Sequence, residues 1–141
     1  MRNFITAGVA LLFLVSVTVC FAEPKITSLV GTWSAKAEGG VLVRGEKTGK
    51  TTHWENQQQT TLEAEIIITK QKDRVIYGVF TSKKAKENFI AVIGTDNKLY
   101  FADEDGFLDG KIINDDTIEV IYRHVTPTDT VVSIGIWTRK K

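Results

Sequence analysis

Two histidines are the side chains of this sequence best suited to binding a metal or moving a proton. His53 and His124 are its only histidines, and the acidic run Asp103-Glu104-Asp105 lies between them in the chain. A metal site would require these side chains to converge, and the acidic run lacks the spacing and final glutamate of a calcium loop. We therefore expect ordinary polar residues here, with no metal ion.

A glycine- and lysine-rich segment, Gly45 to Thr51, imitates a phosphate-binding loop. It is one residue short between its glycines, and no helix is expected after it to offer backbone amides to a phosphate. We interpret this similarity as a coincidence of composition.

No pair of residues indicates catalysis. Glu63 and Glu65 occupy the polar phase of a strand, which faces water. The only cysteine, Cys20, lies in the expected leader, and neither histidine has an identifiable partner to orient it. We therefore expect a protein that is not an enzyme, with no catalytic residues and no cofactor.

Short alternating segments separated by turn residues predict an all-β fold. Between Thr60 and Lys70, apolar residues at every second position alternate with glutamates, which is the period of a half-buried strand. Similar segments follow to the end of the chain, and Leu29 to Ala37 precedes them. The expected strands are 29–37, 60–70, 74–82, 87–94, 98–103, 107–113, 117–125 and 130–139.

Eight strands predict a closed antiparallel up-and-down barrel, because sequential hairpins close antiparallel only when the strand count is even. This requires residues 38–59 to form one long loop. The alternative is ten strands, with Val41-Leu42-Val43 pairing with the segment from Thr51 to Trp54 as an extra hairpin. Counting strands places the long loop and every second later turn at one end of the barrel, which we expect to be its mouth.

Strand phase indicates which side chains face inward near that mouth. Tyr122 and His124 share an apolar phase that Glu119 and Arg123 oppose. An eight-stranded barrel has room either for side chains alone or for one small ligand. If there is a cavity, the expected ligand-binding residues are Phe101, Tyr122 and His124 on the strands and Trp54 on the long loop.

Gly31-Thr32-Trp33 on the first strand and Trp137-Thr138-Arg139 on the last, with the hairpin order between them, resemble the calycin superfamily of lipocalin- and avidin-like barrels. The resemblance implies that Trp33 plugs a closed end, where Arg139 packs across it and Gly31 and Trp137 lie nearby. No helix is visible before the last strand, which favours the avidin type. Biotin binding is not implied, because the later strands supply no tryptophan before Trp137.

Residues 1–22 are typical of a cleavable export signal, with Arg2 followed by an apolar run and small residues before Glu23. The run is too short for a membrane span, which takes ~20 residues. Lipid attachment at Cys20 is the alternative, although bulky Val19 precedes it. We expect one domain over residues 23–141, in the periplasm or secreted.

Without Arg2 the 18 basic residues become 17, which equals the 17 acidic residues. This balance argues against nucleic acid or an anionic membrane as the main partner. Two functions are then expected. The first is an exported protein that holds a small, largely apolar ligand in or at the mouth of the barrel. The alternative is a protein–protein interaction module, such as an inhibitor of an exported hydrolase, that acts through residues 38–59.

Overall fold

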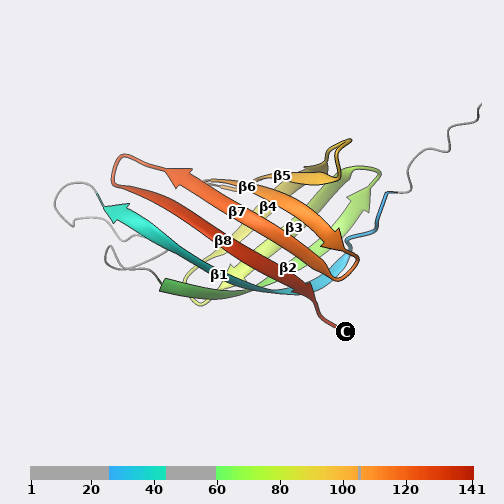
Figure 1. The fold of residues 1–141 in the computed structure, drawn as a ribbon, viewed down its shortest axis with the longest axis horizontal. Helices are drawn as coiled ribbons and strands as arrows, with labels where there is room; N and C mark the ends of the chain where they lie inside the picture. Colours follow the sequence, from blue (N-terminus) through green and yellow to red (C-terminus); the bar gives the residue numbers. More distant parts are fainter. Residues whose placement is uncertain (1–25, 44–59, 105) are drawn as a thin grey trace, which may run out of the picture.

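A computed structural model describes residues 26–43, 60–104 and 106–141, and its eight strands form a closed antiparallel barrel (Figure 1). Each strand pairs with the next in the chain, and β8 pairs with β1 to close the sheet. The predicted eight-stranded up-and-down barrel is confirmed. The strands are β1 (Gly31–Val43), β2 (Thr60–Lys72), β3 (Val75–Ser82), β4 (Lys86–Ile93), β5 (Lys98–Ala102), β6 (Phe107–Asn114), β7 (Thr117–Val125) and β8 (Asp129–Arg139).

The interior of the barrel is made by the apolar phase of each strand. On β7 and β8, buried and outward-facing residues alternate over nearly the whole length. The carboxylates Glu63 and Glu65 take the outward phase of β2, where they form ion pairs with Lys36 and Lys140. One-sided burial of this kind explains why a period of two residues runs through the sequence.

The connections separate into two ends, as the strand count requires. At one end lie the tight turns at Asp73-Arg74, Gly94 to Asn97, and Asp115-Asp116. Asp73 and Asn97 have φ values of 52° and 58°, in the left-handed region that aspartate and asparagine tolerate better than most residues. At the other end, the mouth, β1 ends and β2 begins, and β3–β4, β5–β6 and β7–β8 are connected there (Figure 1).

The end with the tight turns is closed by Trp33, which has no exposed surface. Its indole N–H donates to the carbonyl oxygen of Leu29 at 3.1 Å, and the Arg139 guanidinium lies 4.2 Å from the centre of its ring. Arg139 also donates to the carbonyl oxygens of Ser28 and Val30, at 3.0 and 2.8 Å. The segment before β1 therefore lies across this end and is fastened to the last strand.

A bulge in β2 supplies a second fastening. The pairing of β2 with β3 shifts register between Ile68 and Lys70, and beyond this point Gln71 reaches the segment before β1. Its side-chain oxygen accepts the N–H of Leu29 at 2.8 Å, and its side-chain nitrogen donates to the carbonyl of Thr27 at 3.0 Å. The bulge therefore lets a side chain hydrogen-bond backbone groups of the segment before β1, which lies outside the strands.

Strand β1 continues to Val43, so residues 38–43 do not belong to the expected loop 38–59. Glycines at 39 and 40 suggested a loop, because glycine is depleted in strands. A Cβ on Gly39, however, would lie 2.7 Å from the Cα of Ser133 and closer still to the carbonyl oxygen of Val132. Glycine is needed there because β1 and β8 approach closely where the barrel closes. The barrel has eight strands and not ten, because residues 41–43 continue β1 and pair with β8. The other half of the expected extra hairpin, Thr51 to Trp54, lies outside the described residues.

Replacing Gly39 with alanine is expected to lower the free energy of unfolding by about 1–3 kcal/mol, the usual range for overpacking. Gly40 is the matched control, because a Cβ there would meet nothing within 4 Å. Urea denaturation followed by circular dichroism measures both variants. Equal losses for Gly39→Ala and Gly40→Ala would contradict the close-approach explanation.

Candidate functional site

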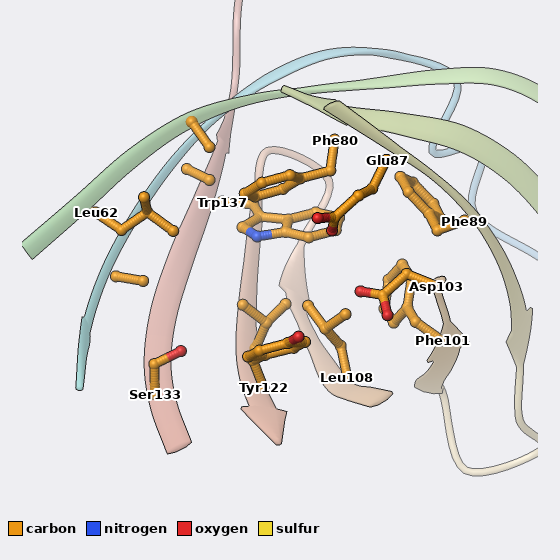
Figure 2. Close-up of a pocket in the computed structure, with 14 residues that line it drawn as sticks. Leu62, Phe80, Glu87, Phe89, Phe101, Asp103, Leu108, Tyr122, Ser133 and Trp137 are labelled. Atoms are coloured by element: carbon orange, nitrogen blue, oxygen red, sulfur yellow. The ribbon is translucent and has the colours of Figure 1, made fainter. Parts of the chain in front are cut away.

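The mouth half of the barrel holds a cavity with an aromatic floor. The rings of Phe101 and Trp137 lie 5.2 Å apart between centres, and those of Phe89 and Phe101 lie 5.4 Å apart, both edge to face. Figure 2 shows these rings with Phe80 beside the indole. The open space is about 60 Å³, counted as positions available to the centre of a water molecule. A cavity of about 150 Å³ holds benzene, so this space accommodates part of an aromatic ring, and a larger ligand would extend toward the mouth.

Small side chains on β1 and β2 leave this space open. Ala35 and Ala64 are paired across the two strands, and both line the cavity together with Ala37. Gly110 on β6 has a different role, because a Cβ there would lie 3.0 Å from Leu99 and 3.2 Å from Phe101. The missing side chain of Gly110 therefore makes room for the floor residues, while the alanines make room for a ligand.

Polar groups surround the cavity above its floor. Glu87 on β4 and Asp103 after β5 line it, as do the side chains of Tyr122 and Ser133 (Figure 2). Asp103 is held by the β5–β6 turn, where its Oδ1 accepts the N–H of Gly106 at 2.6 Å. Gly106 packs directly on the tyrosine, since a Cβ there would lie 2.7 Å from the Tyr122 oxygen. The turn thus positions a carboxylate and a phenol on the same cavity wall.

His124 lies behind Tyr122 in a chain of hydrogen bonds. The Tyr122 oxygen is 3.1 Å from His124 Nδ1, and His124 Nε2 is 2.8 Å from Oδ1 of Asp129. His124 and Asp129 are each only 4% exposed. Thr126 accepts the N–H of Asp129 at 3.0 Å and donates its hydroxyl proton to Oδ1 of Asp129 at 2.6 Å.

The protonation of the imidazole decides the direction of these hydrogen bonds. An ionised carboxylate only accepts, so beside an ionised Asp129 the Nε2 atom of His124 carries a proton. In the tautomer that carries no proton on Nδ1, this nitrogen accepts from the Tyr122 hydroxyl. Carboxylate, imidazole and hydroxyl in this order orient one another as in hydrolase triads. Here the hydroxyl is a phenol, and in that tautomer its proton points to His124 and away from the cavity.

The residues expected from the sequence are partly brought together. Phe101 and Tyr122 line the cavity, and His124 reaches it only through Tyr122. Trp54 lies outside the described residues. Trp137, expected at the closed end, forms part of the cavity floor and is 3% exposed.

Sequence reasoning missed two carboxylates of the site. Glu87 has the inward phase of Phe89 on β4, and Asp103 has the inward phase of Phe101 on β5. That shared phase was the available signal, but charged residues next to turns are ordinarily solvated. Within the described ranges, no group of three or more histidine, cysteine, aspartate or glutamate side chains is placed to hold a metal ion.

Comparisons with known proteins add no relative to this description. No family model matches the sequence, and searches of curated proteins and of solved structures find no match either. In the parts of the chain that the structure describes, no helix has the length and apolar character needed to cross a membrane. Strand order and register show an all-antiparallel closed barrel, which is compatible with a calycin-like fold.

Proposed function

We propose that this chain is an exported, non-enzymatic binding protein of the calycin type, which holds a small, largely apolar ligand in the mouth half of its barrel. The observation that supports this most is a cavity with an aromatic floor in the half of the barrel away from the Trp33 plug. Ligand sites commonly combine apolar walls with a few placed polar groups. The expected export signal, residues 1–22, lies outside the described residues.

The binding energy in this proposal comes from covering apolar surface. The apolar groups that a bound ligand would cover are the rings of Phe89, Phe101 and Trp137, with Leu62 and Leu108 on the walls. Each Å² of apolar surface removed from water contributes about 25 cal/mol. A one-ring ligand with a short tail would place part of its ring against this wall and extend from the cavity toward the mouth, and 2-phenylethanol is a neutral probe of that kind.

Filling the cavity is expected to weaken the binding of 2-phenylethanol at least about tenfold, or ~1.4 kcal/mol. Ala64→Leu places extra methyl groups in the space opposite the floor, because Ala64 lines the cavity. Ala102→Leu is the matched control, since Ala102 takes the outward phase of β5 between Phe101 and Asp103. Isothermal titration calorimetry compares the two. Unchanged affinity in Ala64→Leu, or no binding by the unmodified protein, would refute the proposal.

The alternative function stays a prediction. A protein–protein contact through residues 38–59 now concerns mainly 44–59, which lie outside the described residues, because 38–43 form part of β1. Deleting residues 46–57 should abolish capture of a hydrolase partner while circular dichroism still reports the barrel.

Mass spectrometry of the mature N-terminus distinguishes cleavage after Ala22 from lipid attachment at Cys20.

A further inference from the structure

The charged groups that line the cavity are acceptors of hydrogen bonds. Glu87 and Asp103 turn their carboxylates into the space beside Trp137 (Figure 2). Ionised carboxylates accept hydrogen bonds and cannot donate them. Because Oδ1 of Asp103 accepts the N–H of Gly106, the orientation of its carboxylate is fixed by the backbone of the turn. A ligand that reaches these groups therefore meets negative charge held in a defined direction.

Tyr122 adds an acceptor to the same wall. Its oxygen lies 3.1 Å from His124 Nδ1, and Nε2 of the same ring lies 2.8 Å from Oδ1 of Asp129. With the imidazole protonated on Nε2 alone, the phenol donates its proton to Nδ1. Toward the cavity the phenol oxygen then presents lone pairs. Glu87, Asp103 and Tyr122 together favour a ligand that donates protons, while Ser133 can serve as donor or acceptor. An anionic ligand would be repelled by the two carboxylates. An apolar tail at this position would displace the water that hydrates these groups and would make no hydrogen bonds in its place.

The floor supplies a second attraction for positive charge. Phe89, Phe101 and Trp137 are packed edge to face or at a tilt, so their ring faces are turned in different directions around the cavity. A cation within about 6 Å of an aromatic ring face is attracted by ~0.5 to 2 kcal/mol, and aromatic rings recognise ammonium groups in this way. The rings of the floor and the carboxylates of the wall thus both favour a positively charged ligand.

We propose that the ligand is a small organic ammonium ion: an apolar body, about one ring in size, attached to a protonated amine. The apolar body lies against Trp137 and Phe101, and the ammonium group donates to Glu87, Asp103 and the oxygen of Tyr122. This inference rests on the proposed function and specifies the ligand of the same site. The His124–Asp129 pair acts as a positioning element, because it holds the Tyr122 proton away from the ammonium group.

Three probes of the same shape test the proposal by calorimetry near neutral pH and at about 50 mM salt, where screening is weak. They are 2-phenylethylamine, neutral 2-phenylethanol and anionic 3-phenylpropionate. We expect the amine to bind at least about tenfold more tightly than the alcohol, as one or two charge-assisted hydrogen bonds would give. The acid should bind more weakly than the alcohol. Raising the salt concentration should weaken the amine alone.

Variants assign the preference to this wall. Glu87→Gln should lower affinity for the amine about tenfold and leave affinity for the alcohol within about twofold. Asp103→Asn is the second variant, and its amide oxygen still accepts the Gly106 N–H. Glu63→Gln is the matched control, since it removes an equal charge from a carboxylate that is 75% exposed on the outer surface and pairs with Lys36.

The outcomes separate the inference from the proposed function. Equal binding of amine and alcohol by the unmodified protein would overturn the inference and still support an apolar ligand. Binding of none of the three probes would overturn both. A preference for the amine that survives in Glu87→Gln and in Asp103→Asn would show that these carboxylates do not select the ligand, and would overturn the assignment.

Discussion

Replacing Trp33 with alanine is expected to lower the free energy of unfolding by about 3–5 kcal/mol, the range for truncating a large buried aromatic side chain. Trp33 has no exposed surface, so the loss includes both its transfer from water and the cavity left behind. The variant also loses the hydrogen bond to the Leu29 carbonyl and the ring on which the Arg139 guanidinium lies. Urea denaturation followed by far-ultraviolet circular dichroism measures the change.

Two controls separate the plug from aromatic content in general. Trp33→Phe keeps a ring under Arg139 and loses mainly the indole N–H bond and some volume, so it should cost less than Trp33→Ala. Tyr100→Ala removes an aromatic ring that is 44% exposed on the outer surface of β5, and should cost less than about 1 kcal/mol. A loss in Trp33→Ala no larger than that in Tyr100→Ala would contradict the role of Trp33 as the plug of a closed end.

The barrel was predictable because each strand has one wet face and one dry face. On β7 and β8 this alternation reads directly in the sequence, and the even strand count allowed antiparallel closure. The length of β1 was not predictable in the same way. Gly39 reads locally as a loop residue, and only its approach to the backbone of β8 explains a glycine within a strand. That constraint joins residues nearly one hundred positions apart and leaves no local pattern.

The candidate site also has one part that strand phase predicted and one part that it did not. Strand phase predicted that Phe101 and Tyr122 face inward, and both line the cavity. Glu87 and Asp103 share that phase, but depth along the barrel axis decides whether an inward charge lies in a core or at an open mouth. Depth depends on the register of neighbouring strands, such as Ile90 opposite Ala102, which no single strand encodes. A charged residue next to a turn therefore could not be assigned to the cavity without knowing the register of the neighbouring strands.

The partner of His124 was also hidden from the sequence. Asp129 lies five residues later, beyond the β7–β8 turn, and reads as a turn residue beside Pro127 and Thr128. The structure places it at the start of β8, with its side chain 5% exposed and hydrogen-bonded to the imidazole. Antiparallel pairing of β7 with β8 brings His124 and Asp129 together, because both residues take the inward phase of their strands next to the same turn.

Removing that carboxylate is expected to have the other large effect on stability. Asp129→Ala leaves the Nε2 proton of buried His124 without its acceptor and removes the hydrogen bond from the Thr126 hydroxyl. An orphaned buried polar group costs about 1–3 kcal/mol and a lost hydrogen bond about 0.5–1.5 kcal/mol, so the free energy of unfolding should fall by roughly 2–4 kcal/mol. Urea denaturation measures the loss. Nitrogen-15 chemical shifts of the imidazole should show that His124 no longer keeps its proton on Nε2 alone.

Asp129→Asn is the matched control, because its amide oxygen can accept from both His124 and Thr126. We expect it to retain most of the stability and the same tautomer, since both hydrogen bonds accepted by Oδ1 survive. If Asp129→Asn and Asp129→Ala lose equal stability, the hydrogen bonds accepted by Oδ1 are not the source of the stabilisation. The nitrogen-15 shifts of the unmodified protein then distinguish a neutral imidazole from an imidazolium. An imidazolium would donate from Nδ1 as well, so the Tyr122 hydroxyl proton would turn toward the cavity, and the shifts therefore decide whether the tyrosine offers the ligand an acceptor or a donor.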